Sequence, residues 1–294
     1  MRGGSLASVM QKNRCLMVLH AHPDDESSKG AGTMARYAAE GVRVVLVCAT
    51  RGEEGEILNP RMDRPGIKER MAELRVAELE TACDLLGVER IYHLGYRDSG
   101  MAGSEANDNP ASFNRADPDN VMARLVGIIR AERPDVFVCY DESKGYDHPD
   151  HVKVHEYGTR AFEAAGDTDR WPEAGAPWQA SKLYYFAPFQ RDRLQKIHDA
   201  AVAEGIDSPY QEWLDRWDEL EREEQEVTTQ IDVTDYIEVR SKALLAHATQ
   251  IDPDGFWFAI PDELVKRIYP WEDYTLISAR VDTELPEDDL FAGL

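Results

Sequence analysis

The chain has 294 residues, of which 43% are hydrophobic, and its 56 acidic and 33 basic side chains give a formal net charge of −23. This length and hydrophobic content suffice to bury the core of a globular α/β domain. The excess of negative charge disfavours nucleic acid and anionic membrane as partners, because both of them bind basic surfaces.

The first elements in chain order predict a βαβ unit. The apolar run CLMVLHA (15–21) has the length of a strand, GAGTMARYAAEG (30–41) has helical spacing and a glycine stop, and VRVVLVCAT (42–50) is a second strand. After a polar, glycine-rich loop, apolar residues that recur at three and four positions predict a helix over 67–87.

The same alternation continues beyond this helix. A short strand near 90–95 precedes a long loop, a helix over 119–133 and the apolar strand DVFVCY (135–140). Strands that alternate with helices predict an α/β fold, with a Rossmann-like, mostly parallel sheet and helices on both faces.

The second half of the chain has a different pattern. It predicts a loop over 171–189 with a strand at its end, helices around Gln195 and Trp213, and a solvated acidic helix face at DELEREEQE (218–226). The segment TTQIDVTDYIEVRSKALLAHATQI then predicts a strand, a helix cap at Thr234 and a helix.

These patterns divide the chain into three parts. We expect an N-terminal extension (1–14), a Rossmann-like core (15–186) and a smaller α/β lobe (187–294) that packs on the core and is not an independent domain. The N-terminus has no apolar stretch typical of a secretory signal, so we expect a cytoplasmic protein. Its four cysteines lie far apart without CxxC spacing, which predicts reduced core residues.

Ionisable residues gather where the first strand ends, in VLHAHPDDESSKG (18–30). In open α/β sheets, ligands bind beyond the carboxyl ends of the strands. The GxGxxG turn of a dinucleotide-binding sheet is missing from this stretch, so we do not expect that class of ligand. His22 and Asp25, at positions i and i+3, can converge on one cation if the loop turns tightly.

A second cluster of the same kind follows the strand DVFVCY. In DESKGYDHPDHVKVH (141–155), a His-Pro-Asp sequence recurs, and Pro149 is well placed to start a helix. His151 could complete a set of two histidines and one carboxylate, which leaves an open position on a zinc ion, as hydrolytic sites have. The rival pair, His151 with His155, leaves the first cluster without a purpose.

Both clusters resemble a known family. AHPDDES and GYDHPDH are similar to the motifs of the PIG-L/LmbE family of zinc-dependent N-deacetylases. Within it, the chain resembles the actinobacterial amidases of mycothiol S-conjugates, on stretches that span nearly the whole chain: SSKGAGTMARYAAEG, GEEGEILNP, RDSGM, AGAPWQASKLYY, LLAHATQIDP and ELPEDDLFAGL. The sister deacetylase of mycothiol biosynthesis shares fewer of them.

The resemblance implies roles for the residues of the two clusters. His22, Asp25 and His151 would bind Zn²⁺, although Fe²⁺ also suits such ligands, and Asp24 would be the general base. The roles implied in the second cluster are assistance to the leaving amine or the tetrahedral intermediate by His148, orientation of its imidazole by Asp150, and a hydrogen bond from Tyr146 to the oxyanion. Relatives are expected to have glycine or proline at Asp147, whose carboxylate could raise the pKa of His148.

The family also suggests which residues bind the substrate: Lys29, Glu56, Arg75 and Asp98. Glu53 and Glu54 we interpret as ordinary loop residues, and we assign no role to Glu26 beyond support of the ligands. A lone histidine, such as His93, His198 or His247, is most simply a surface or hydrogen-bonding residue.

The resulting hypothesis is a metal-dependent amidase that releases a mercapturic acid and glucosaminyl-inositol from mycothiol S-conjugates. The alternatives are removal of the acetyl group from N-acetyl-glucosaminyl-inositol and, in another class, a non-catalytic sugar-binding protein. The partner expected is a small thiol-sugar conjugate, and we expect no obligate protein partner.

Overall fold

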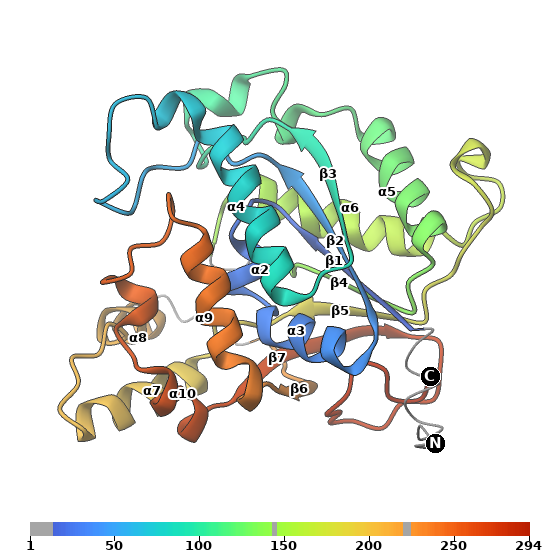
Figure 1. The fold of residues 1–294 in the computed structure, drawn as a ribbon. Coiled ribbons are helices and arrows are strands. Elements are labelled where there is room, and N and C mark those ends of the chain that lie inside the picture. The colour runs from blue at the N-terminus through green and yellow to red at the C-terminus, as the bar shows by residue number, and fades with distance from the viewer. Residues whose placement is uncertain (1–13, 143–145, 220–224) are drawn as a thin grey trace, which may run out of the picture.

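The computed structural model describes residues 14–142, 146–219 and 225–294, which build one seven-stranded sheet in the order β3-β2-β1-β4-β5-β7-β6 (Figure 1). The strands are β1 (Cys15–His20), β2 (Arg43–Thr50), β3 (Arg90–Tyr96), β4 (Val136–Cys139), β5 (Lys182–Phe186), β6 (Thr229–Asp232) and β7 (Trp271–Ala279). The first five strands run parallel, whereas β7 is antiparallel to both β5 and β6. This arrangement confirms the predicted mostly parallel sheet.

The centre of the sheet is the most apolar part of the molecule. Every side chain of β1 and β4 is buried, and so is every side chain of β2 after Arg43. A strand that is covered on both faces needs such a continuous apolar run, which is why these three strands were readable from the sequence.

Helices cover both faces of the sheet, as predicted. On the side nearest the viewer in Figure 1, helices α3 (Ala31–Glu40), α4 (Met71–Leu86) and α9 (Ile237–Ala246) pack on one another. Helices α5 (Pro118–Glu132) and α6 (Pro149–Ala164) pack together on the opposite side. Both of these begin with proline at the first turn, where the missing N–H costs no hydrogen bond.

The order of the strands creates a switch point between β1 and β4. From β1 the chain moves outward to β2 and β3, then returns to place β4 on the other side of β1, in the register Leu16 to Val136. In sheets of this kind the crevice beyond the carboxyl ends of two such strands is the usual place for a ligand. The two ionisable clusters of the sequence follow these two strands.

The second half of the chain contains elements that the sequence patterns did not reveal. Strand β7 and helix α10 (Asp262–Ile268) were not predicted, and β7 joins the other strands rather than forming a sheet of its own. Helices α7 (Arg191–Ala203) and α8 (Gln211–Glu219) lie near the predicted positions. The division of the chain at residue 186 stays a prediction, because β6 and β7 extend the same sheet.

The predicted cap at Thr234 is wrong in detail. Thr234 begins a 3-10 turn, and its own N–H and hydroxyl donate to the carboxylate of Asp232, at 2.9 and 2.7 Å. Helix α9 starts only at Ile237. Most of the acidic run 218–226 lies outside the described residues, so its interpretation stays a prediction.

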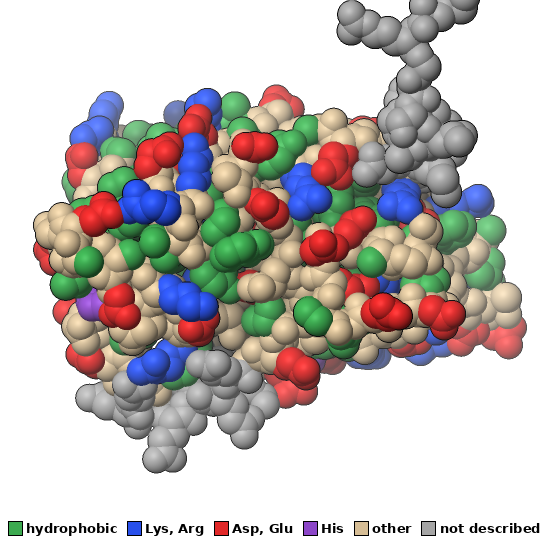
Figure 2. Space-filling model, turned by 90° about the horizontal axis from the view of Figure 1, so that it is seen from below, with side chains coloured by type: hydrophobic (Ala, Val, Ile, Leu, Met, Phe, Trp, Pro, Cys, Tyr) green, Lys and Arg blue, Asp and Glu red, His purple; other side chains and the backbone are tan. Residues whose placement is uncertain are grey.

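The surface carries both signs of charge. On the face shown in Figure 2, acidic and basic side chains alternate, and the residues drawn there form no extended basic patch. Across the described residues, no helix has the length and apolar character needed to cross a lipid bilayer. The four cysteines are free and buried, as expected from their apolar surroundings in the sequence.

One buried ion pair fastens the C-terminal segment to the sheet. Lys182 on β5 pairs with Glu287, and both side chains are almost completely buried. The other carboxylate oxygen of Glu287 accepts hydrogen bonds from the hydroxyls of Tyr184, at 2.6 Å, and Thr229, at 3.3 Å. Because water cannot replace either partner at this depth, each charge depends on the other.

This dependence predicts a difference between single and double variants. Lys182→Met leaves the Glu287 charge buried and unpaired, and should lower the free energy of unfolding by about 3–5 kcal/mol. Lys182→Met combined with Glu287→Gln removes both charges and should cost clearly less. Urea unfolding followed by circular dichroism measures both values, and equal losses would contradict this account of the pair.

Candidate functional site

The candidate site lies at the switch point and is built from two loops. After β1, residues 21–24 lead into the single-turn helix α2 (Asp25–Ser28); after β4, the chain reaches His148, the residue that caps α6. Both loops start from neighbouring parallel strands, so their side chains meet although about 125 residues separate them.

His22, Asp25 and His151 converge, as the sequence predicts for the two clusters. Nδ1 of His22 and Nε2 of His151 each lie 3.5 Å from Oδ2 of Asp25. All three side chains are buried, and their three donor atoms lie within 4.8 Å of one another. Two imidazole nitrogens and one carboxylate oxygen are a donor set that fits a divalent metal ion such as zinc.

The outer nitrogen of His22 has its own partners. Nε2 of His22 lies 3.1 Å from Oδ2 of Asp150 and 3.6 Å from Oδ1 of Asp98. Burial opposes a charge on this imidazole, but the carboxylates of Asp98, Asp150 and Asp25 together raise its pKa well above the usual range. A histidine ligand commonly donates its second N–H to a carboxylate, which fixes the ring and its tautomer.

Asp150 contacts His148 through its backbone and not through its carboxylate. The N–H of Asp150 donates to Nδ1 of His148, at 3.2 Å, while the Asp150 carboxylate accepts from His22 and from the N–H and hydroxyl of Ser99. The contact of Asp150 with the His148 imidazole is thus this backbone hydrogen bond, and the orientation of that ring by Asp150 stays a prediction. Since Nδ1 accepts, the proton of a neutral His148 lies on Nε2, which is 3.7 Å from Oδ1 of Asp98.

The largest influences on the pKa of His148 come from groups other than Asp147. Burial, together with the neighbouring His22, lowers the pKa of His148 to about 4. The carboxylates that act in the opposite direction are those of Asp150 and Asp98, whereas the Asp147 side chain is exposed.

Asp24 has an unusual backbone conformation. Its φ of 117° and ψ of −24° lie in a region that residues other than glycine rarely adopt. The side chain remains 27% exposed, and its Oδ2 accepts a hydrogen bond from Nη2 of Arg75 at 2.9 Å. Burial raises the pKa of Asp24, and the Arg75 guanidinium partly offsets that rise.

Arg75 donates three hydrogen bonds to the protein, while its buried Nε has no hydrogen-bond partner among the described residues. It lies buried on α4, and besides Asp24 it donates to the carbonyl oxygens of Pro23 and Gly52. Gly52 has a φ of +68°, and a Cβ at Gly52 or Gly55 would collide with the guanidinium. The GEEG stretch (52–55) therefore packs closely around Arg75, and the predicted contact of this guanidinium with substrate stays a prediction.

The other predicted substrate residues lie in different surroundings. Lys29 donates to Oδ1 of Asp25 at 2.6 Å and lies over the ring of Tyr140. The side chain of Glu56 is exposed, and Asp98 is buried between His22 and His148.

The neighbours of Glu56 in the loop are more than ordinary loop residues. The Glu53 side chain is only 8% exposed, and one of its oxygens accepts from the N–H of Asp98 at 3.1 Å. Glu54 pairs with Arg97. Glu53 therefore helps to place Asp98, which the sequence pattern did not suggest.

Tyr146 borders the site from the second loop. Its ring packs edge-on against His151, with ring centres 4.8 Å apart, and is stacked on His148 at 6.1 Å. The residue is 52% exposed, so it can reach a bound molecule. Nδ1 of His155 lies 3.1 Å from the carbonyl oxygen of Tyr140, and among the described residues His155 belongs to neither group of side chains that could hold an ion.

Sequence reasoning missed two residues that contact the clusters. Ser99 binds the carboxylate of Asp150 with both its N–H and its hydroxyl. His247, interpreted as a simple hydrogen-bonding residue, is completely buried and lies 2.6 Å from the carboxylate of Glu26. No local sequence pattern could predict these contacts, because the partners lie 51 and 221 residues apart along the chain.

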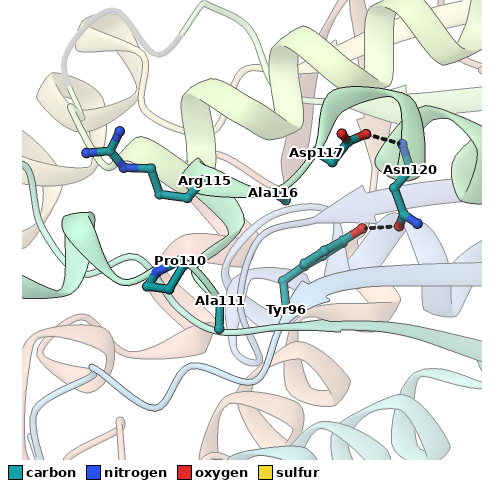
Figure 3. A pocket seen from close by; sticks show the side chains of 7 residues that line it. All are labelled: Tyr96, Pro110, Ala111, Arg115, Ala116, Asp117 and Asn120. Carbon is teal, nitrogen blue, oxygen red and sulfur yellow. Dashed lines mark hydrogen bonds between the residues drawn. The ribbon is translucent and has the colours of Figure 1, made fainter.

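A cavity of about 670 Å³ lies beside the carboxyl end of β3 and is separate from the histidine cluster (Figure 3). Asn120 connects its polar side chains, because its Oδ1 accepts from the hydroxyl of Tyr96 and its N–H donates to Asp117. None of the ionisable residues around His22 lines it. Its polar groups belong mainly to the cap of α5 and not to the candidate site.

Comparison with known proteins agrees with this geometry. The family model PIG-L, described as GlcNAc-PI de-N-acetylase, matches residues 17–162, which contain both clusters. A Streptomyces coelicolor protein named mycothiol S-conjugate amidase is 47% identical over 284 residues, covering 95% of this chain and 97% of its own length. A Geodermatophilus obscurus protein named 1D-myo-inositol 2-acetamido-2-deoxy-alpha-D-glucopyranoside deacetylase is 40% identical, covering 97% and 99%.

A solved structure shares the fold. The N,N'-diacetylchitobiose deacetylase from Pyrococcus horikoshii superimposes with a TM-score of 0.62 at 20% identity, covering 90% of this chain and 84% of that one. Identity of at least 40% along nearly the whole chain shows that this chain and these two relatives share a common ancestor. The chain therefore belongs to the PIG-L family and is a hydrolase that acts on amide bonds.

Proposed function

We propose that the protein is a zinc-dependent amidase that hydrolyses mycothiol S-conjugates. It would cleave the amide between an S-substituted N-acetylcysteine and glucosaminyl-inositol, and so release a mercapturic acid from a trapped electrophile. The observation that carries this choice is the 47% identity, along almost the full length of both chains, to a protein named mycothiol S-conjugate amidase. The biosynthetic deacetylases, at 40% identity or so, are the alternative.

The proposed metal ligands are Nδ1 of His22, a carboxylate oxygen of Asp25 and Nε2 of His151. Their mutual distances support this set, and the contact of Asp150 with the outer nitrogen of His22 supports it independently. A zinc ion held there would polarise the amide carbonyl and make the attacking water more acidic. Ferrous iron is the other ion that such donors accept.

Asp24 is the proposed general base. It is adjacent to a proposed ligand, keeps part of its side chain exposed, and has a pKa that burial raises. A carboxylate with a raised pKa takes a proton from water more readily, and can return that proton to the leaving amine.

His148 and Tyr146 are proposed to stabilise the tetrahedral intermediate. With a pKa of about 4, His148 is neutral near pH 7, and its Nε2–H is available as a hydrogen-bond donor. A neutral imidazole is a poor proton donor, so hydrogen bonding to the intermediate is favoured over protonation of the amine. The Tyr146 hydroxyl would provide a second donor toward the same developing charge.

Lys29, Glu56 and Asp98 are proposed to contact the sugar. Lys29 and Asp98 contact residues of the two loops, and the side chain of Glu56 is exposed. Arg75 is bound to three oxygens of the protein, so we propose that it acts on the substrate only through Asp24.

The first prediction from the proposed function distinguishes cleavage of mycothiol S-conjugates from removal of an acetyl group. The metal-loaded enzyme should have a higher kcat/KM for a mycothiol S-conjugate, such as the bimane derivative, than for N-acetyl-glucosaminyl-inositol. Asp24→Asn should abolish most of either activity, because an amide cannot accept the proton. Preference for the acetyl substrate would favour the deacetylase, and equal activity of wild type and variant would refute the mechanism.

The second prediction concerns metal binding. His22→Ala and His151→Ala should each lose bound zinc, whereas Asp24→Asn should keep one ion per chain, because Asp24 is not a ligand in the proposed set. Metal analysis after gel filtration gives the stoichiometry. His155→Ala is the matched control on the same helix, and loss of metal from that variant would instead support the rival histidine pair.

The third prediction concerns the pH profile. A carboxylate base must be ionised, so kcat/KM falls as the pH drops below its pKa. Since Arg75 lowers the pKa of Asp24, Arg75→Gln should move this acid limb to higher pH. Arg130→Gln, which removes a similarly buried arginine that binds carbonyl oxygens away from the site, should leave the limb in place. An unchanged limb in Arg75→Gln would contradict the role of Asp24.

A further inference from the structure

Glu26 and His247 form a completely buried pair that contacts the backbone of Asp24. Nε2 of His247 is 2.6 Å from Oε1 of Glu26, and both side chains have no exposed surface. The other oxygen of Glu26 accepts the backbone N–H of Asp24 at 3.0 Å. The three residues thus form a chain of contacts that runs from the C-terminal half of the protein to the proposed base.

The backbone of Asp24 needs such a contact. Its φ of 117° costs on the order of 1–3 kcal/mol in a residue other than glycine, and such a conformation persists only when its surroundings hold it. Several interactions do so. The N–H of Asp24 is held by Glu26, and Arg75 binds both the Asp24 carboxylate and the carbonyl oxygen of Pro23 in the same peptide. The carbonyl oxygen of Asp24 accepts two backbone N–H groups of helix α2. Loss of the contact to Glu26 leaves the N–H of Asp24 without this partner, so the strained backbone is held less firmly and the carboxylate can shift from its position.

His247 in turn determines where Glu26 lies. It follows helix α9, which packs against α2, α3 and α4. Among the described residues, Oε1 of Glu26 has one polar contact besides His247, the hydroxyl of the adjacent Ser27. A buried carboxylate that loses its ionic partner relocates toward water or is destabilised, and either change releases the N–H of Asp24.

We propose that Glu26 and His247 are positioning residues that hold Asp24 in its catalytic conformation. The inference rests on the proposed role of Asp24 as the base. His247 contacts neither the substrate nor the reacting atoms, and it acts through Glu26 on the peptide of Asp24.

The pair is distinct from the metal site. Among the described residues, the two groups of side chains that can hold an ion contain neither Glu26 nor His247. Both oxygens of Glu26 are already used by the N–H of Asp24, the hydroxyl of Ser27 and the His247 ring. Loss of the pair should therefore affect the chemical step while the metal stays bound.

The experiment compares metal-loaded variants with a mycothiol S-conjugate as substrate. His247→Ala and Glu26→Gln should each lower kcat about 10–100-fold, the range typical of lost supporting interactions, with KM close to the wild-type value and one metal ion per chain. His247→Gln keeps an N–H donor toward Glu26 and should recover a large part of kcat. It also replaces His247→Ala in the test if the alanine variant does not fold.

Thr249→Val is the matched control. Thr249 is also completely buried, lies two residues beyond His247, and donates its N–H and hydroxyl to Glu78 on α4, at 2.8 and 2.7 Å. The variant thus removes a similar contact of the same segment without touching Glu26. Its kcat should stay near that of the wild type; an equal loss would show that any loosening of this segment has the same effect, and would overturn the specific role of His247.

A double-mutant cycle identifies the route of the effect. In an Asp24→Asn background, His247→Ala should cause little further loss of kcat, because residues that act through one another are not additive. The same fold-loss in both backgrounds, a normal kcat in the single variants, or loss of metal from them would overturn the proposal. Failure of the proposed function looks different: the wild type would not cleave the conjugate, or Asp24→Asn alone would be as active as the wild type.

Discussion

The parallel pairing of β1 with β4 is the constraint on which the rest of the site depends. It places the loop that follows His20 beside the loop that follows Cys139, although strands β2 and β3 and helices α3, α4 and α5 separate them along the chain. Each group of side chains that could hold an ion among the described residues combines His22 from the first loop with residues of the second: His151 in one group, His148 and Asp150 in the other. The switch point of the sheet makes one site from two halves.

The electrostatics of the site follow from this convergence. Four carboxylates, those of Asp24, Asp25, Asp98 and Asp150, lie around His22, and Lys29 and Arg75 are the cations that pair with them. In a metal-bound site the ligating imidazole of His22 is neutral. The four carboxylates and these two cations then leave two negative charges, which one divalent ion would balance. Buried charges of one sign are costly unless they are compensated, so the donor set and the charge balance agree.

The sequence predicted the parts of the site that depend on strand ends. The proximity of His22, Asp25 and His151 follows from apolar runs that are readable as buried strands, and from the rule that parallel strands end at the same edge. The histidine that contacts the Asp150 carboxylate was not predictable in the same way. Asp150 contacts both His22, through its carboxylate, and His148, through its backbone N–H, and the sequence does not distinguish the two. Strand β7 was missed because WEDYTLISA mixes charged and apolar residues, as a strand exposed on part of its length does.

The segment that follows α9, residues 247–250, makes contacts that no local sequence pattern indicates. Within four residues it contacts three parts of the core: His247 binds Glu26, Thr249 binds Glu78, and Gln250 donates to the carbonyl oxygen of Glu56. Hydrogen bonds from Leu58 to the carbonyl of Thr249 and from Asn59 to that of Ala248 join it further to the loop that follows β2.

These contacts give the second half of the chain a part in the site. The match to the family model ends at residue 162, so every residue of this segment lies outside it. The strained Asp24 and the loop around Arg75 nevertheless depend on it for their geometry, since one is held through Glu26 and the other through Glu56. In the proposed mechanism, the core provides the metal ligands and the C-terminal half holds the base and the neighbouring loop, so the two tasks depend on different parts of the chain.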